Sequence, residues 1–228
     1  FLTEARERGH HVPPEMRAKG LLYRRSGADG EGGGLAEERT RAYAAYVLAR
    51  NGRPAAPYAA ALEARLERSF KSEWRRDPAA AFLAAVHRLQ QDPRRADPLA
   101  SALRLAEKVA PDFLHFHDAM ARDSQILFVF ARHFPERLRD LRPDDLQAIA
   151  DGVAGGSYNS LSSAWAVMAL SAYADAVGPA AFEGLALSAE TRGGGSRPLA
   201  LPKGLFPKAA LPPDATALVV ESRGPVFF

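Results

Sequence analysis

The stretch GGSYNSLSSAWAVMALSAYADAV, residues 155–177, decides the fold. A glycine pair ends the preceding segment, and Asn159 or Ser160 is expected to cap a new helix, because a short polar side chain accepts a hydrogen bond from a free N–H of the first turn. Positions i, i+4, i+7 and i+11 of one helix face are then apolar: Leu161, Trp165, Met168 and Ala172. The stretch therefore predicts a helix whose apolar face meets other elements.

Further apolar residues, among them Tyr173, cover much of the remaining surface of this helix. A helix that is apolar almost all round belongs inside a larger assembly. At about 17 residues, with serine at both ends, it is too short and too polar for a good membrane span. We therefore expect a structural core that includes these residues: Trp165, Met168, Leu161 and Tyr173.

The composition is that of an ordinary globular protein, with 47% apolar and 25% charged residues in a chain of 228. The net charge is +3, and charges of both signs are interspersed, as in ERSFKSEWRRD, so we expect no nucleic-acid partner. Cysteine is absent, which excludes disulfides, thiol catalysis and cysteine-ligated zinc. The sequence predicts no cofactor. It contains no signal peptide and no membrane span.

The two ends of the sequence suggest a piece of a longer protein. The first residue is Phe1 rather than methionine, and the final GPVFF is typical of a strand interrupted midway. We therefore expect a helical domain that is incomplete at its N-terminus and a β segment that is incomplete at its C-terminus.

Helical patterns fill the first three quarters of the chain, punctuated by glycine and proline. The expected helices cover residues 1–9, a segment opened by Pro13 and Pro14, residues 35–51, a segment from Pro57, a segment from Pro78, residues 96–109, 118–134 and a segment from Pro143.

Four of the helical segments share one design, a small-residue apolar helix that ends in a polar turn: RAYAAYVLARNG, AAFLAAVHRLQQDP, ILFVFARHFP and AWAVMALSAYADAVG. More amphipathic helices lie between them. Alternation of buried and half-buried helices with short connections is typical of stacked helical hairpins. The fold class expected is mainly α, an α/α toroid of hairpins, although the pattern leaves a closed ring and an open solenoid undistinguished.

The pattern changes after Gly178. FEGLALSAE and ATALVVESR alternate in the manner of strands, with glycine- and proline-rich turns between them. We expect a helical toroid domain over residues 1–178 and a β-sandwich segment over residues 179–228.

SYNSLSSAWAVMALSAYADA resembles the last toroid helix of bacterial alpha-2-macroglobulin-like proteins, and ARDSQILFVFARHFPERL and RTRAYAAYVLARNG resemble earlier helices of the same domain. The strands from Phe182 onward resemble the CUB-like β-sandwich that follows the toroid in that family. The resemblance spans most of the chain and depends on the order of several segments rather than on one diagnostic motif.

The resemblance implies a large periplasmic protease trap, usually anchored by a lipid at the inner membrane through a segment outside this sequence. A target protease cuts a bait region, and the protein then changes shape. Other domains of the same chain and target proteases are the partners implied. Thioester-bearing members carry C-x-E-Q early in the toroid, but this chain has no cysteine. Either the motif lies upstream of Phe1 or the protein is a member that lacks it, so no thioester residue is assigned in this chain.

Several short motifs have alternative chemical interpretations. His115, His117 and Asp118 have a metal-like spacing, but three ligands alone are in view, and Asp118 is an ordinary helix cap. His10 and His11 are expected in an exposed turn.

The acidic pair Asp144 and Asp145 lies in the first turn of a helix, where carboxylates stabilise the helix dipole. Ser157-Tyr158-Asn159 has the S-x-N form of penicillin-binding enzymes, but the chain has no S-x-x-K, and Lys203-Gly204 lacks the threonine of K-T-G. A turn and a helix cap explain the S-x-N segment better.

Trp165 and Met168 could instead line a ligand pocket inside a toroid, as in cyclases or glycosidases. Glycosidases need two facing carboxylates, and AWAVMALSAYADA offers only Asp175 near its end. A helical-repeat scaffold is the third alternative, and the β segment favours the macroglobulin interpretation over it. We therefore predict a non-enzyme with no catalytic, cofactor or metal residue.

The two tryptophans are expected to differ in burial. Trp165 lies on the apolar helix and should be deeply buried. Trp74 lies in the charged run KSEWRRD and should be partly exposed, so its truncation should cost less stability.

Overall fold

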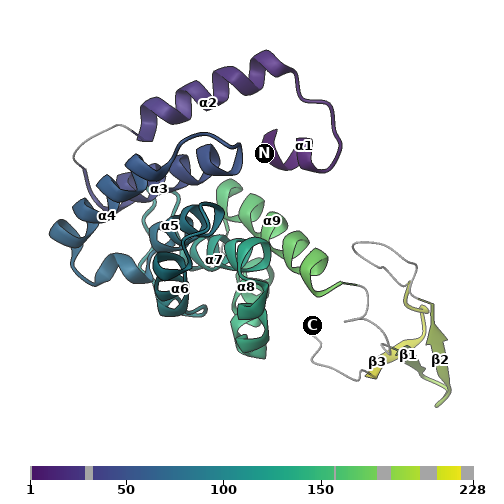
Figure 1. Cartoon of the computed structure of the whole chain (residues 1–228). Coiled ribbons are helices and arrows are strands. Elements are labelled where there is room, and N and C mark those ends of the chain that lie inside the picture. The colour runs from purple at the N-terminus through teal and green to yellow at the C-terminus, as the bar shows by residue number, and fades with distance from the viewer. Residues whose placement is uncertain (1, 29–32, 157, 179–185, 201–209, 222–228) are drawn as a thin grey trace.

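The computed structural model describes residues 2–28, 33–156, 158–178, 186–200 and 210–221, in which helices come first and a small sheet follows (Figure 1). The elements are α1 (Leu2–Glu7), α2 (Pro14–Ala28), α3 (Leu35–Arg50), α4 (Ala56–Phe70), η1 (Glu73–Arg76), α5 (Pro78–Leu89), α6 (Pro93–Ala102), α7 (Ala119–His133), η2 (Pro135–Asp140), α8 (Pro143–Ala154), α9 (Ser160–Val177), β1 (Ala186–Thr191), β2 (Ser196–Leu199) and β3 (Ala215–Glu221). The mainly-α prediction with a following β segment is confirmed.

Polar side chains start the main helices, as the sequence indicates. Asp77 accepts a hydrogen bond from the Ala79 N–H at the start of α5 (2.8 Å), and Asp118 accepts one from the Ala121 N–H at the start of α7 (2.7 Å). Asn159 caps α9. Each cap satisfies an N–H group that the helix itself leaves free.

The four small-residue helices pack in sequence order, α3 on α5, α5 on α7 and α7 on α9. The more amphipathic helices flank this row: α2 and α4 pack on α3, α6 on α5 and α8 on α7. Almost every side chain of α5 and α7 is buried, because both helices have neighbours on several sides. This alternation is the one that stacked hairpins require, and closure into a ring stays a prediction.

The predicted bounds of the helix over residues 96–109 are wrong at both ends. It begins earlier, at Pro93, after the capping residue Asp92, and it ends at Ala102. Leu103 then adopts an extended backbone with φ −77° and ψ 141°. An extended chain lets Leu103 and Leu105 both reach the core, where they are 1% and 3% exposed, and this burial overrides helix propensity.

Two burial predictions are also wrong. Leu161 is 42% exposed, because the first turn of α9 lies at the rim of a cavity rather than between helices. Trp74 is only 1% exposed, because the charged run folds into the 3₁₀ helix η1, which directs the indole inward. Trp165 is buried at 6% exposure, and Met168 and Tyr173 are partly buried against the same core.

The strands form an antiparallel sheet in the order β2-β1-β3. Leu187 pairs with Leu199 on one side and with Val220 on the other, and the register shifts once between Glu190 and Thr191. The strand-like patterns around these residues are therefore confirmed, whereas the start at Phe182 and the final GPVFF lie outside the described residues. The boundary near Gly178 stays a prediction.

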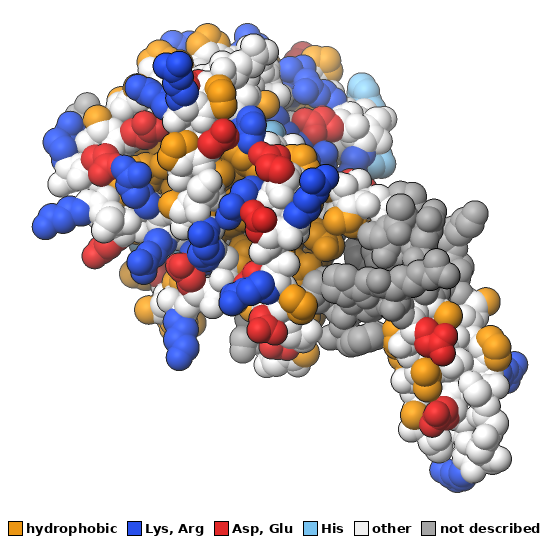
Figure 2. Space-filling model, turned by 60° about the horizontal axis from the view of Figure 1, so that its bottom comes forward, with side chains coloured by type: hydrophobic (Ala, Val, Ile, Leu, Met, Phe, Trp, Pro, Cys, Tyr) orange, Lys and Arg blue, Asp and Glu red, His pale blue; other side chains and the backbone are white. Residues whose placement is uncertain are grey.

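The surface carries charges of both signs, with hydrophobic side chains between them, on the face drawn in Figure 2. Within the described ranges, none of the helices has the length and apolar character needed to cross a bilayer.

Candidate functional site

Aromatic rings from all four helices of the inner row meet around Trp165. The centroid of its ring system lies 5.5 Å from that of Tyr43 on α3, 5.6 Å from that of Phe128 on α7 and 5.9 Å from that of Phe82 on α5. The Tyr43 and Phe128 rings meet it edge to face, a favoured geometry for aromatic pairs. Trp165 thus contacts rings from the three other inner helices, and α3 and α5 also meet directly where the ring of Tyr43 lies 5.1 Å from that of Phe82.

Two cavities border this aromatic cluster. The first, which we call the α2 cavity, has a volume of about 290 Å³ and lies between α2 and the inner helices, with Tyr43, Trp165 and Met168 in its wall. The second, the α9 cavity, has a volume of about 210 Å³ and is lined by Tyr43, Trp165, Leu161 and Gln125. Trp165 and Met168 therefore do line a pocket, as the enzyme alternative requires, while Trp165 also serves the core.

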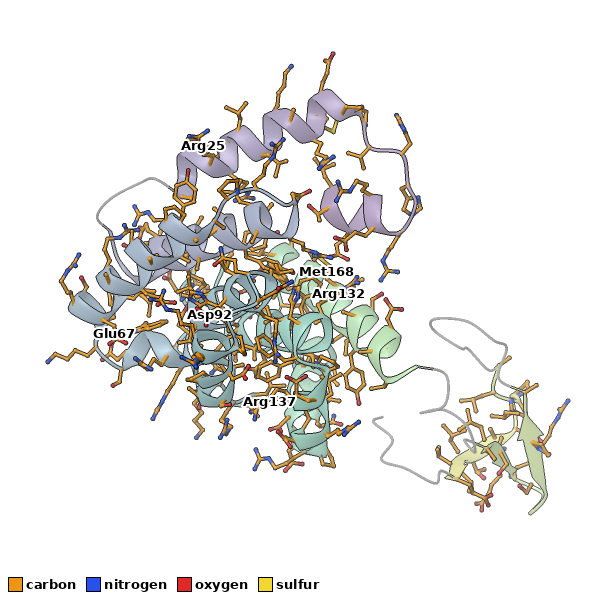
Figure 3. The ribbon with its side chains drawn as sticks, in the orientation of Figure 1. Arg25, Glu67, Asp92, Arg132, Arg137 and Met168 are labelled. Atoms are coloured by element: carbon orange, nitrogen blue, oxygen red, sulfur yellow. The ribbon has the colours of Figure 1, made fainter. Side chains whose placement is uncertain are left out.

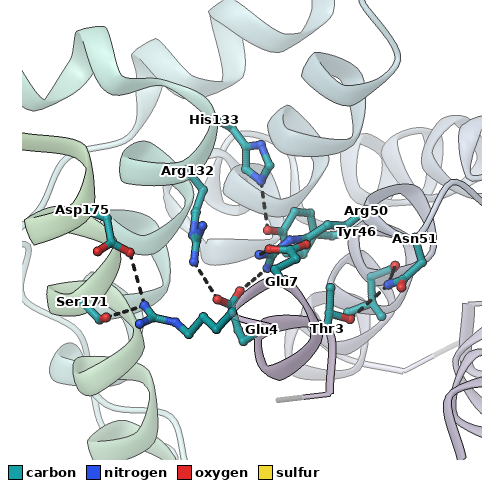
Figure 4. Close-up of polar contacts among 12 residues, drawn as sticks. Thr3, Glu4, Glu7, Tyr46, Arg50, Asn51, Arg132, His133, Ser171 and Asp175 are labelled. Atoms are coloured by element: carbon teal, nitrogen blue, oxygen red, sulfur yellow. Dashed lines mark hydrogen bonds and ion pairs between the residues drawn. The ribbon is translucent and has the colours of Figure 1, made fainter. Parts of the chain in front are cut away.

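A network of ion pairs fixes α1 to the helical body (Figure 4). Glu4 lies between two arginines: its carboxylate contacts Arg50 of α3 and, at 2.7 Å, Arg132 of α7. Glu7 also pairs with Arg50. The side chain of Glu4 is 13% exposed and that of Arg50 is 10% exposed, so these charges are largely removed from water.

The end of the same segment reaches α9. Arg8 donates to the Ser171 hydroxyl at 2.5 Å and pairs with Asp175 at 3.3 Å. Asp175 is the acid that the sequence offered near the end of this helix, and the structure gives it a role in holding the chain rather than in facing a second carboxylate.

A buried tyrosine–histidine pair lies under this network. The Tyr46 hydroxyl and His133 Nε2 are 2.9 Å apart. Burial, together with the positive charges of Arg50 and Arg132, lowers the pKa of His133 to about 4. Burial also raises the pKa of Tyr46 above its usual value. At neutral pH both groups are uncharged, so the pair presents no ionised nucleophile.

The two histidines of HFHD, His115 and His117, lie in different environments. His115 Nδ1 lies 2.8 Å from Asp112, and its Nε2 lies 3.5 Å from Glu37. His117 is buried, and this burial lowers its pKa to about 4. Asp118 caps α7 and accepts a hydrogen bond from Asn159 Nδ2 at 3.0 Å. No group of three or more candidate metal ligands occurs in the described part of the chain.

The other motif residues have structural roles. Asp145 accepts a hydrogen bond from the Arg142 N–H at 2.8 Å at the start of α8, while Asp144 is exposed in the same turn. Asn159 accepts from the N–H groups of Leu161 and Ser162, both at 2.9 Å.

The remaining motif residues fall in two groups. His10 and His11 are exposed. Ser157, Lys203 and Gly204 lie outside the described residues.

Sequence reasoning missed a buried cluster on α7. Arg122 donates to Asp123 at 2.6 Å and to the backbone carbonyls of Arg76 and Arg104 at 2.8 Å and 3.0 Å, and it pairs with Glu107. Burial raises the pKa of Asp123 to about 6, although Arg122 acts in the opposite direction. The signal for this cluster was an arginine and an aspartate inside the otherwise apolar run DAMARDSQILFVF.

Curated proteins with similar sequences share one name. The Alpha-2-macroglobulin of Rickettsia conorii is 33% identical over 177 residues, which cover 78% of this chain and 9% of that protein. The Alpha-2-macroglobulin of Pasteurella multocida is 33% identical over 186 residues, 76% of this chain and 10% of that protein. The Alpha-2-macroglobulin homolog of Yersinia pestis is 27% identical over 186 residues, with 78% and 9% covered.

No family model and no solved structure matches the chain. The chain spans about a tenth of the length of these relatives. The similarity nevertheless extends over about three quarters of the chain in each case, and the order of helices followed by strands is the one that the resemblance implies. The chain is therefore alpha-2-macroglobulin-like.

Proposed function

We propose that this chain supplies the helical toroid domain, and the start of the β-sandwich that follows it, to a macroglobulin-type inhibitor of endopeptidases. The observation that carries the proposal is the similarity to three proteins named as alpha-2-macroglobulins over 76–78% of the chain. The domains proposed are residues 1–178 and residues 179–228.

In this proposal the helical part acts as a rigid body whose exposure changes after a target protease cuts a bait region elsewhere in the protein. The packing supports a rigid body, because the inner helices share one aromatic cluster around Trp165. Elements that share a close-packed core move together rather than bend. The chain has no cysteine, so it supplies no thioester nucleophile of its own.

The proposed protein lies in the periplasm, is held at the inner membrane by a lipid anchor outside this chain, and contacts proteases and other domains of the same polypeptide. These three features come from the family resemblance. The dispersed charges and the small net charge of +3 favour protein partners over nucleic acid.

We also propose that the chain is not an enzyme, in keeping with relatives named as macroglobulins. The α2 cavity is the feature that favours the toroid-enzyme alternative. Its described lining contains one carboxylate, Glu4, and both Arg50 and Arg132 contact that group. A glycosidase would need a second carboxylate facing it. Turnover of glycosides that disappears on Glu4→Gln would favour the enzyme alternative instead.

The test of trapping uses the full-length protein with an endopeptidase such as trypsin. A trap encloses its protease, so cleavage of a large substrate such as casein should fall by at least tenfold while cleavage of a small chromogenic peptide continues. Equal loss of both activities would indicate an active-site inhibitor, and no loss of either would refute the proposal.

A further inference from the structure

Two residues that line the cavities each carry a buried polar atom that has no hydrogen-bond partner among the described residues. Gln125 is 7% exposed and lines the α9 cavity, and its Oε1 accepts no hydrogen bond from any described residue. Arg17 lines the α2 cavity, and its Nε is buried and likewise unpaired among the described residues. A buried polar group left unsatisfied is costly, so a ligand that pairs with both atoms gains binding energy from them.

The α2 cavity is also positively charged at its edge. Arg17 and Arg24 lie seven residues apart on the face of α2 that lines the cavity, about 10 Å apart along the helix axis. Within the described ranges neither forms an ion pair, and the guanidinium of Arg24 lies 5.2 Å from the centre of the Tyr43 ring. The one acid in the lining, Glu4, is already held by Arg50 and Arg132. The cavity therefore attracts anions.

The two cavities adjoin, because Arg24, Tyr43 and Trp165 line both of them. The aromatic walls suit an apolar side chain. The Gln125 amide suits a peptide backbone, since Oε1 accepts from an N–H and the amide nitrogen donates to a carbonyl. Free carboxylates suit the two arginines.

We propose that the adjoining α2 and α9 cavities bind a short acidic peptide segment with two apolar residues between two acidic ones. One apolar side chain enters the α2 cavity beside Trp165. The backbone N–H of the segment donates to Gln125 Oε1, and its carboxylates accept from Arg17 and Arg24. Two acids three residues apart in an extended chain are about 10 Å apart, which matches the spacing of the arginines. This binding is separate from protease trapping and stands or fails independently of it.

The probe is the peptide acetyl-Glu-Leu-Phe-Glu-amide, and its matched control is acetyl-Gln-Leu-Phe-Gln-amide. Trp165 reports binding through its fluorescence in the Trp74→Phe chain, since the protein has only two tryptophans. Calorimetric titration of the unaltered chain provides the same ranking if Trp74→Phe impairs folding. We expect the acidic peptide to bind at least tenfold more tightly than the glutamine peptide.

Variants locate the site. Arg17→Gln and Arg24→Gln should each weaken binding of the acidic peptide about tenfold. Arg25→Gln is the matched control, because Arg25 lies on the same helix, lines neither cavity and lies apart from Met168 in Figure 3. Arg25→Gln should leave the affinity within twofold. Equal affinity for both peptides, or equal effects of all three variants, would overturn the proposal.

A second probe separates a peptide site from a site for free carboxylates. Gln125→Met removes the acceptor for a backbone N–H, so it should weaken the acidic peptide about tenfold while leaving 1-naphthaleneacetate unaffected. If Gln125→Met leaves the peptide affinity unchanged, the site recognises carboxylates alone and the assignment to a peptide is wrong.

Discussion

The centre of the helical body and its first helix are held by different forces. In α5 and α7 nearly every side chain is buried, and helices pack against both from several sides. In α1 none of the residues is buried, and its ion pairs reach α3 and α7, while Arg8, just after the helix, reaches α9.

The two regions should differ in stability and in their response to salt. Apolar burial involves no charges, so salt does not screen it, and its stabilisation is lost only when the helices separate and expose the buried area. The pairs of Glu4 are largely removed from water and gain little net stability, because desolvation offsets their attraction. The more exposed pairs of Glu7 and Arg8 contribute little each and are screened by salt. We therefore expect α5 and α7 to define the stable unit, and α1 to dock on it as a weaker and salt-dependent element.

The largest expected effect concerns the two tryptophans. Trp74→Ala should destabilise the chain by about 3–5 kcal/mol, because it truncates a side chain that is 1% exposed. Trp165→Ala should cost less than Trp74→Ala, since Trp165 is more exposed, at 6% against 1%, and its side chain borders two cavities. Urea denaturation of both variants measures the two free energies of unfolding.

Trp74→Phe is the control for volume and should retain most of the stability. If Trp165→Ala proves the more damaging change, the packing centre lies at α9. The claim that α5 and α7 form the most stable part of the fold would then be wrong.

Arg122→Ala tests the polar part of the centre. Its removal leaves the buried Asp123 carboxylate without its closest cation, which should cost about 3–5 kcal/mol. Arg95→Ala is the matched control on α6, where an exposed pair with Asp92 at 4.0 Å should contribute at most about 1 kcal/mol. Equal effects of the two alanine variants would show that the α7 cluster is not desolvated.

His133→Gln tests the contact between the two regions through the pH dependence of the free energy of unfolding. The folded-state pKa of His133 is lowered from 6.5 to about 4, so between these values the unfolded chain binds more protons than the folded chain. His133 therefore lowers the stability as the pH falls from about 6.5 towards 4. The variant should lose less stability than the unaltered chain over this window.

Denaturation curves at pH 7 and pH 5 for the two proteins isolate this contribution, because the opposite dependence of Asp123 is present in both and cancels in the difference. Parallel losses in the two proteins would mean that His133 is exposed or protonated in the fold.

Glu7→Gln should have the smallest effect. The pair of Glu7 with Arg50 is one of several that hold α1, and its loss should change the free energy of unfolding by less than about 1 kcal/mol. The change should shrink further in 0.5 M salt. Glu15→Gln in α2 is the control, and a larger effect of Glu7→Gln that persists in high salt would show apolar rather than ionic docking of α1.

The centre of the fold was predictable from the sequence, and its edges were not. The helical repeat of apolar residues and the capping residues Asp118 and Asn159 predicted α7 and α9 correctly, because these signals depend only on neighbouring residues in the sequence. Trp74 was misjudged because the charges around it lie on the outer side of a short 3₁₀ helix, which has no 3.6-residue period to reveal its inner side. The burial of Leu161 was predicted wrongly, because the apolar period shows which face of α9 is packed but not how far the neighbouring helices extend along that face.

The candidate site was less predictable than the fold. Trp165 and Met168 were recognisable as either core or pocket wall, and the structure places Trp165 in both roles. Gln125 and Arg17 gave no signal, since an unpaired buried atom depends on what distant segments leave unfilled. Their surroundings follow from how α2 packs on α3 and α9 packs on α7, which no local pattern encodes.

Amide hydrogen exchange across the chain tests the central claim most directly. We expect the amides of α5 and α7 to exchange only through global unfolding, and those of α1 to exchange with a much lower opening free energy that falls further in 0.5 M salt. Protection of α1 equal to that of α5, unchanged by salt, would contradict the claim that the first helix docks onto the apolar centre mainly through its charged side chains.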